Sequence, residues 1–448
     1  MSFAAKRKPA PLISTEVEYP LGCNEKAKPL VFEAWNALMN ERPDDAKEQL
    51  TLALEADPRC VMARATLGRN WQPDQLNAVE RLHAQSLTAF REGRVQESFL
   101  ISRRLQRQAP QVMMANLISA RAALAVGKWT EAAEAATVAT ELTPMNGAGW
   151  YLLGAAKLRA GFVEEALAAF LKYAEVAPGE ANAHAAIGDA LLANHQVDAA
   201  GASYQRAIDR SKGRQWRAWS GVATVMALKG DWTAARAAIA THRAAAPSSA
   251  DQVDSDVMLA WSYAAQDRLS EALRVAGPLR AAPLLRGELL LTSGKNLEAI
   301  AAFTALEREP LSNVNRARAL AGLSVAWSRL GRTAAAANTL RRLERLGSGP
   351  AVMDQRWYAR GALALAQAAP RRALESLRAC SDAFDACTLL RIEALQAAGE
   401  AAEALEARAQ LAEANHRDPR YWFIHQQLSA PANPTRAARS PEPLPLPD

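Results

Sequence analysis

The sequence predicts an all-α fold built as a solenoid of stacked helix–turn–helix hairpins. Pro110, Pro144 and Pro178 are each 34 residues apart, and Pro247 follows at twice that period plus one. Because a proline cannot donate the i→i−4 hydrogen bond, each of them closes a helix at a regular interval. Alanine dominates the apolar residues, and period-two runs of β-branched residues are missing. A helix-ending signal at this period indicates an array without a single enclosed core.

The clearest unit spans residues 147–180. Its marker residues are Trp150, Leu153, Gly154, Gly161, Ala166, Phe170 and Pro178. Gly154 and Ala166 remove bulk where two helices cross, Phe170 fills the space between hairpins, and Gly161 suits the turn. This pattern resembles the tetratricopeptide repeat, over about residues 30–420. The resemblance implies a right-handed superhelix of such hairpins that binds other proteins.

The spacing of the repeat signals predicts the domain organisation. The 52 residues between Pro58 and Pro110 exceed one period by 18, which indicates an insertion. The 63 residues from Pro247 to Pro310 fall short of two periods, so we expect shortened hairpins and a change of superhelical curvature there. The expected segments are a flexible N-terminal segment (1–26), a first hairpin (27–60), an insertion or degenerate hairpin (61–78), a regular array (79–249), degenerate shortened hairpins (250–312), C-terminal hairpins (313–419), a capping helix (420–430) and a Pro-rich disordered tail (431–448).

The capping helix is predicted from an apolar cluster after the last hairpin. Tyr421, Trp422, Phe423, Ile424 and Leu428 lie between Pro419 and Pro431. An exposed end repeat needs a cover, so we expect this helix to cover the last hairpin. Beyond it, the prolines of the tail favour polyproline II.

Net charge and cysteine spacing limit the class of partner and the cellular compartment that we expect. The 53 basic and 47 acidic residues nearly balance, giving a net charge of +6, which argues against tracking of nucleic-acid phosphates. Cys23, Cys60, Cys380 and Cys387 show no CxxC spacing and read as reduced, isolated thiols. With no run of about 18 apolar residues, the protein is expected to be cytoplasmic.

No motif for catalysis or for a cofactor is present. The six histidines are scattered and form no metal-binding motif, and GxxxxGK[ST], GxGxxG and GxSxG are missing. We therefore expect a protein without enzymatic activity, cofactor or metal.

The resemblance implies a partner-binding groove lined by the first helix of each hairpin. The residues at its lining places include Trp35, Phe90, Arg91, Arg121, Tyr151, Arg159, Asn182, Asp189 and Arg217. Aromatic patches interleaved with arginines suit an extended or helical segment that carries apolar and acidic residues. The alternative is that these arginines are merely solvated.

Three other functions stay open beside a protein-binding scaffold or adaptor. An accessory subunit of a bacterial secretion, envelope or polysaccharide-assembly machine is one, by analogy of fold. An RNA-binding helical repeat protein is suggested by the basic pI near 9.2. A regulator whose Pro-rich tail docks elsewhere is the third, because the tail contains a PxxP.

Overall fold

The computed structural model describes residues 19–40, 42–213, 215–246, 248–347, 349–381, 384–413 and 418–429. Within these ranges the regular structure is helical, without strands, as the sequence predicts. The chain divides into two compact units, one of residues 1–194 with 209–211, the other of residues 195–208 with 212–448. The expected Pro-rich tail, the helix-ending Pro247 and residues 1–18 of the expected N-terminal flank lie outside the described residues.

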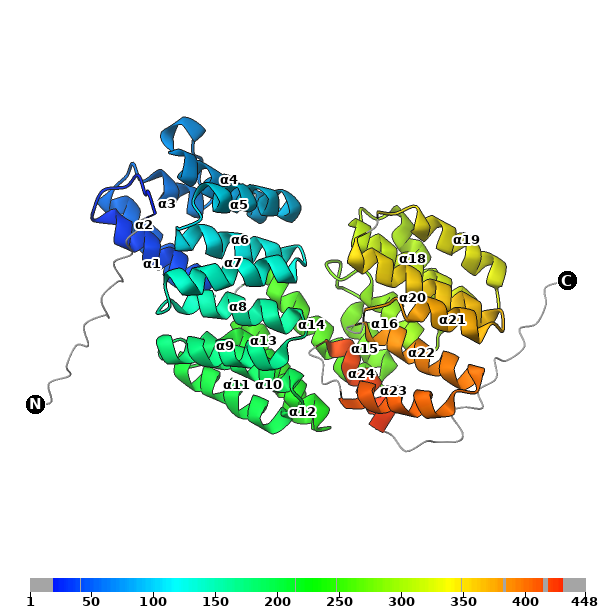
Figure 1. Cartoon of the computed structure of the whole chain (residues 1–448). Coiled ribbons are helices and arrows are strands. Elements are labelled where there is room, and N and C mark those ends of the chain that lie inside the picture. Colours follow the sequence, from blue (N-terminus) through cyan, green and yellow to red (C-terminus); the bar gives the residue numbers. More distant parts are fainter. Residues whose placement is uncertain are drawn as a thin grey trace, which may run out of the picture. The chain divides into compact units, whose positions relative to one another are not determined.

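Unit 1 consists of hairpins that follow one another along the chain (Figure 1). Its helices are α1 (Ala27–Met39), α2 (Pro43–Ala56), α3 (Val61–Thr66), the short 3-10 helix η1 (Pro73–Gln75), α4 (Ala78–Arg91), α5 (Val95–Gln108), α6 (Met113–Ala125), α7 (Trp129–Leu142), α8 (Gly147–Arg159), α9 (Val163–Val176) and α10 (Ala181–Ala193). The first helices of successive hairpins, α4, α6, α8 and α10, contact one another in that order and form one layer. We call these first helices A helices and their partners B helices.

Unit 2 repeats this hairpin arrangement and ends in a single helix. Its helices are α11 (Val197–Ser211, whose last three residues belong to unit 1), α12 (Trp216–Leu228), α13 (Trp232–Ala245), α14 (Ser249–Ala264), α15 (Leu269–Ala276), α16 (Leu285–Thr292), α17 (Asn296–Ala305), η2 (Leu306–Arg308), α18 (Asn313–Arg329), α19 (Thr333–Glu344), α20 (Pro350–Ala366), α21 (Pro370–Leu377), α22 (Asp385–Ala398), α23 (Ala401–Glu413) and α24 (Pro419–Ser429). Helices α15 and α16 have only 8 residues each and lie in the region where shortened hairpins are expected.

In the hairpin of α8 and α9, a large B-helix side chain packs against a small A-helix residue. Phe170 of α9 lies against Gly154 of α8, where an added Cβ would be only 2.5 Å from the ring atom Cε1. Gly161, in the turn between them, has φ +86°, a conformation that side-chain-bearing residues rarely adopt. The roles predicted for Gly154 and Gly161 are thus confirmed. Phe170, expected between hairpins, fills the crossing inside its own hairpin and also shares a cluster with Ala186 and Ile187 of α10.

Unit 2 uses the same pairing of small and large residues. Phe303 of α17 faces two glycines at once, Gly287 of α16 and Gly322 of α18, and a Cβ at either would be 2.5 Å from its ring. Tyr204 of α11 fills the space over Gly221 of α12 in the same way. The close approach of neighbouring helices therefore depends on glycine at these crossings.

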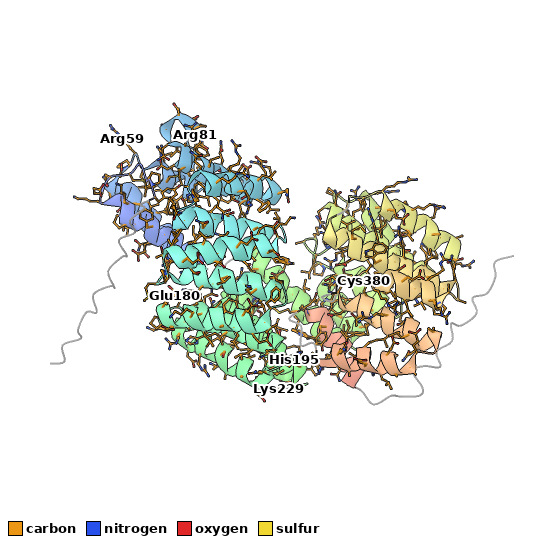
Figure 2. The ribbon with its side chains drawn as sticks, in the orientation of Figure 1. Arg59, Arg81, Glu180, His195, Lys229 and Cys380 are labelled. Atoms are coloured by element: carbon orange, nitrogen blue, oxygen red, sulfur yellow. A yellow bond between two sulfur atoms is a disulfide. The ribbon has the colours of Figure 1, made fainter. Side chains whose placement is uncertain are left out.

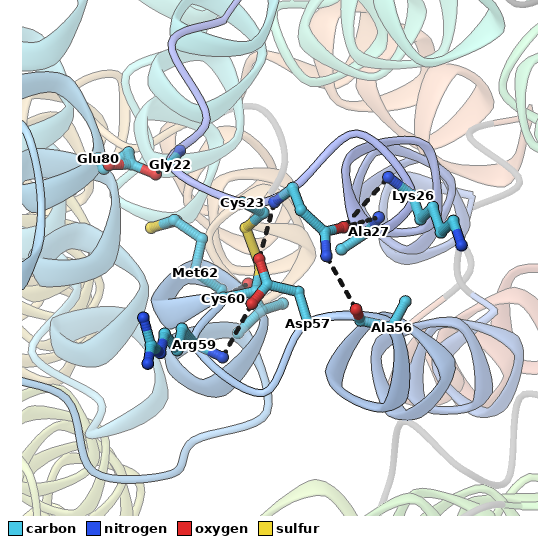
Figure 3. The surroundings of a disulfide bond; sticks show 12 residues. Gly22, Cys23, Lys26, Ala27, Ala56, Asp57, Arg59, Cys60, Met62 and Glu80 are labelled. Atoms are coloured by element: carbon cyan, nitrogen blue, oxygen red, sulfur yellow. Dashed lines mark hydrogen bonds between the residues drawn. A yellow bond between two sulfur atoms is a disulfide. The ribbon is translucent and has the colours of Figure 1, made fainter.

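The prediction of reduced, isolated thiols is wrong. Cys23 forms a disulfide with Cys60, and Cys380 forms one with Cys387, so the described chain holds its four cysteines in two pairs. Cys23 lies before α1 and Cys60 after α2, 37 residues later, where hydrogen bonds from Asn24 to Asp57 and Ala56 close the same junction (Figure 3). Spacing along the sequence did not reveal this pairing because the hairpin brings its two ends together.

Residues 19–23 depart from the expectation of a flexible N-terminal flank. Tyr19, Leu21 and Cys23 are buried and belong to the main apolar cluster of unit 1. The buried Glu80 of α4 accepts a hydrogen bond from the Gly22 amide at 2.7 Å. This segment is therefore part of the folded unit.

Within the described ranges, no helix is long and apolar enough to cross a membrane.

Candidate functional site

The nine predicted groove residues fall in both units. Eight lie in unit 1, on α1 (Trp35), α4 (Phe90, Arg91), α6 (Arg121), α8 (Tyr151, Arg159) and α10 (Asn182, Asp189). Arg217 lies on α12 of unit 2. The residues predicted to line one groove therefore belong to two separate units. We describe the surroundings of each residue in turn.

Trp35 lies inside an aromatic cluster. Its side chain is 2% exposed, its ring contacts those of Tyr19 and His83 at 5.1 and 4.6 Å between centroids, and its indole donates to Thr66 Oγ1 at 3.0 Å. The Tyr19 hydroxyl and His83 Nδ1 are 2.9 Å apart, and burial lowers the pKa of His83 to about 3. Trp35 therefore stabilises unit 1 and does not offer a surface to a partner.

Two of the predicted residues meet across neighbouring A helices. The Arg121 guanidinium of α6 lies over the Phe90 ring of α4, 5.1 Å from its centroid, in a cation–π contact. Arg91 turns the other way, and its guanidinium donates to the backbone carbonyl of Thr66 at 3.1 Å. Phe90 and Arg121 thus form an aromatic and basic patch over α4 and α6.

Tyr151 and Asn182 are involved in packing between helices. The half-buried Tyr151 ring lies 6.3 and 5.8 Å from the rings of Phe170 and Tyr173. Asn182, near the start of α10, is 6% exposed. Tyr151 keeps part of its ring accessible, whereas Asn182 is nearly covered.

Arg159 and Arg217 are exposed, as Arg91 is, whereas Arg121 is half-buried. Arg159, at the end of α8, forms no hydrogen bond or ion pair with any residue in the described part of the chain. Arg217 lies over the ring of Trp216, 5.1 Å from its centroid. Asp189 of α10 is half-buried. Of the predicted arginines in unit 1, Arg159 is therefore the one best placed to pair with a carboxylate from outside.

Sequence reasoning missed that the first hairpin reaches the α9–α10 connection. Arg42, at the start of α2, forms an ion pair with Glu180 at 3.0 Å (Figure 2 labels Glu180), and the Tyr173 hydroxyl donates to Asn40 Oδ1. Burial raises the pKa of Glu180, against the opposing effect of the Arg42 charge. Neither contact carries a periodic signal, because its partners are more than 130 residues apart.

In unit 2, helix α24 covers more than the expected last hairpin. It contacts α23 and also α12 and α14, which precede it by more than 150 residues. Figure 1 shows α24 beside α14 and α23, in agreement with these contacts. Its side chains Tyr421, Trp422, Phe423 and Ile424 are 0, 1, 5 and 6% exposed. The A-helix layer of unit 2 is therefore covered in part by the chain's own helix α24.

A small cavity of about 100 Å³ lies between α17, α18 and α19. Phe303, Leu320 and Leu323 line its apolar side, and Arg342, paired with Glu307 at 2.9 Å, lies at its polar side. This volume is well below that of small-molecule sites, which span roughly 300–1,000 Å³. Among the described residues, no group of three or more His, Cys, Asp or Glu side chains is placed to hold a metal ion.

The comparisons with known proteins identify the repeats. The tetratricopeptide repeat profile matches residues 119–181, 185–250 and 284–351. No curated protein matches the sequence. Among solved structures, TTC0263, a thermophilic TPR protein of Thermus thermophilus, has 21% identity over 44% of this chain and 100% of its own, with a TM-score of 0.37.

Two further solved structures are similar over more of the chain. A tetratricopeptide repeat protein of Parabacteroides merdae has 14% identity over 68% of this chain and 99% of its own, with a TM-score of 0.39. The APC/C hetero-tetramer Cut9–Hcn1 has 15% identity over 85% of this chain and 78% of the matched chain, with a TM-score of 0.41. The chain thus contains tetratricopeptide repeats over the three stretches that the profile matches, within an all-helical fold of hairpins.

Proposed function

We propose that this chain is a non-enzymatic scaffold that holds a segment of a partner protein on the A helices of unit 1. The surface consists of Phe90, Arg121, Tyr151 and Arg159, and we call it the unit 1 surface. The observation that supports it best is the Arg121–Phe90 contact across α4 and α6, together with the exposed Arg159, which has no partner in the described chain. Trp35 and Asn182 are left out because they are buried.

The chemistry of this surface defines the segment that it would bind. Guanidinium groups form strong, charge-assisted hydrogen bonds with carboxylates, and aromatic rings bind apolar side chains. An extended or helical segment with acidic residues spaced between apolar anchors therefore fits. Arg121 is half-buried over an aromatic ring, which weakens its hydration and favours a paired carboxylate over free solvation.

The test compares two double variants, each of which replaces two arginines by glutamates, on different surfaces of unit 1. Arg121→Glu with Arg159→Glu reverses the unit 1 surface, and Arg104→Glu with Arg107→Glu reverses two exposed arginines of the B helix α5. Proteins captured from a nuclease-treated lysate of the source organism are quantified for the wild type and both variants. We expect the first variant to lose the captured partner and the second to keep it. Equal capture by all three proteins would contradict the unit 1 surface.

The same experiment separates the alternative functions. A set of captured proteins from one machine would indicate the accessory subunit. With an untreated lysate added for comparison, capture that is lost on nuclease treatment would indicate RNA binding. Because the two described disulfides are typical of oxidising compartments, we propose such a compartment in place of the cytoplasm that reduced thiols suggested.

A further inference from the structure

The amino-terminal half of helix α24 is enclosed on nearly all sides, whereas Gln426 in its second half is exposed. Tyr421, Trp422, Phe423 and Ile424 are consecutive and each is less than a tenth exposed. Consecutive helical residues point about 100° apart, so four of them cover most of the circumference. A helical turn that is buried all round is surrounded by other elements, whereas one that only covers the end of an array keeps a face in solvent. Helix α24 therefore occupies a site within unit 2.

The four side chains enter two different apolar clusters. Tyr421 and Ile424 belong to the cluster formed mainly by α16–α23, and Trp422 and Phe423 belong to the cluster of α12–α16. The Phe423 ring meets Trp261 of α14 edge-on, with 6.5 Å between centroids. Aromatic side chains of this size dominate the energetics of helix-in-groove recognition. Helix α24 thus has the anchors of a bound helical peptide.

Charged groups fix the position of the amino-terminal end of α24. Arg420 Nε lies 2.9 Å from Asp418 Oδ2, and the carboxylates of Glu288 on α16 and Asp385 on α22 act on the same guanidinium. Burial would raise the pKa of Asp418, but hydrogen bonds from Arg420 and the charge of Arg318 on α18 hold it below its usual value. Charges on three A helices therefore act on the amino-terminal end of α24.

Side-chain contacts hold α24 to the rest of the unit. The Tyr421 hydroxyl donates to the carbonyl of Leu411 at 2.7 Å, and Arg408 of α23 donates to the carbonyl of Leu428 at 3.1 Å. No backbone–backbone hydrogen bond joins α24 to another helix within the described residues. Release of α24 would therefore leave the hydrogen-bond ladders of α12, α14 and α23 intact.

Two buried indole nitrogens lack acceptors around α24. Nε1 of Trp422 and Nε1 of Trp219, on α12, are buried without a hydrogen-bond partner among the described residues. A buried donor left unsatisfied destabilises the arrangement that buries it. Both tryptophans belong to the same apolar cluster or pack against it. With α24 in place, this region therefore contains two buried N–H donors without acceptors among the described residues.

We propose that the surface of α12, α14 and α23 covered by α24 is a binding site for a helix of a partner protein, with α24 as its resident intramolecular ligand. The partner helix carries an acid–arginine pair followed by two adjacent large aromatic residues, as α24 does. An acceptor side chain facing Trp219 gives it an advantage over α24. This site lies in unit 2 and is independent of the unit 1 surface.

The covalent link makes α24 a strong competitor. A tethered ligand is present at an effective concentration in the millimolar range, so a free helix of equal affinity binds the wild-type chain only weakly. Weakening α24 within the chain removes this competition. The site is then open to the same sequence added in trans.

The experiment uses a fluorescent peptide of residues 418–429 and the full chain. Its fluorescence anisotropy is followed on titration with the wild type and with a Trp422→Ala, Phe423→Ala variant. We expect the apparent affinity to be at least tenfold higher for the variant, and a peptide with the same two substitutions not to bind. Phe162→Ala, at an exposed position in unit 1, is the control and should behave as the wild type. A folded variant that binds the peptide no better than the wild type overturns the proposal.

A second measurement requires no variant. Hydrogen exchange of the wild type should show the amides of α24 exchanging at least tenfold faster than those of α14 and α18, because α24 opens by itself. Exchange of all three helices at one common rate overturns the proposal. Light scattering tests the other occupant: dimers that dissociate on addition of the peptide would assign the site to α24 of a second copy and would also overturn it.

Discussion

The hydroxyl of Tyr173 donates a hydrogen bond to Oδ1 of Asn40, which lies 133 residues earlier in the chain. Both side chains are buried, and the Tyr173 ring lies where any side chain at position 147 would have to be, against Gly147. The first hairpin of unit 1 is therefore joined to α8 and α9 by a contact far outside the repeat period. Repeat arrays are held mainly by contacts between neighbours, so this one adds cooperativity over a longer range.

A double-mutant cycle measures that contact. Tyr173→Phe and Asn40→Ala should each lower the free energy of unfolding by about 1–3 kcal/mol, because each leaves a buried polar partner unsatisfied. The double variant should lose less than the sum, with a coupling energy of about 1 kcal/mol. Urea denaturation followed by circular dichroism provides the values, and additive losses would show that the two side chains do not interact.

Gly322→Ala tests the packing around Phe303. Alanine favours a helix over glycine by about 1 kcal/mol, yet its Cβ would lie 2.5 Å from the Phe303 ring. We expect net destabilisation of about 1–3 kcal/mol from overpacking, and partial recovery when Phe303→Leu is added. Gly347→Ala is the control, since no atom lies within 4 Å of the Cβ it would add. A thermal melt in which the Gly322 variant equals or exceeds the wild type would contradict this packing.

The buried His83 predicts a loss of stability in acid. Its pKa is about 3 in the folded protein because of burial, and about 6.5 when unfolded. Between these values the unfolded state binds the extra proton, so the free energy of unfolding decreases as the pH falls from 6.5 towards 3. At pH 5 this group contributes a loss of about 2 kcal/mol relative to pH 7.

The matched variant is His83→Gln, which keeps a polar group beside Tyr19 and cannot titrate. Urea denaturation at pH 7 and pH 5 should show the stability difference between wild type and variant decreasing by about 2 kcal/mol. A difference that stays constant between the two pH values would mean that folding does not lower the pKa of His83.

The disulfides predict a dependence on reducing agent. Closing loops of 37 and 7 residues stabilises a chain by about 4 and about 2 kcal/mol in the loop-entropy model. Cys23→Ser with Cys60→Ser should therefore lower the stability of unit 1 more than Cys380→Ser with Cys387→Ser lowers that of unit 2. Titration of the unfolded, unreduced chain should detect no free thiol, whereas four reactive thiols would restore the reduced state that the spacing suggested.

The sequence by itself determined the hairpins and their small–large crossings. Helix ends marked by Pro144 and Pro178, the turn at Gly161 and the close helix crossing at Gly154 are all set within one repeat. Local backbone restrictions and nearest-neighbour packing decide such features, so a periodic pattern is enough to predict them.

Only the tertiary structure decided which helix surfaces are covered by other parts of the chain. The burial of Trp35 by Tyr19 and His83, the pairing of Cys23 with Cys60 and the return of Trp422 to the α12–α14 region depend on where distant segments meet. Each of these contacts occurs only once, so it produces no repeating pattern in the sequence. Their positions follow from how the hairpins stack, because stacking fixes the distance between residues far apart in the chain.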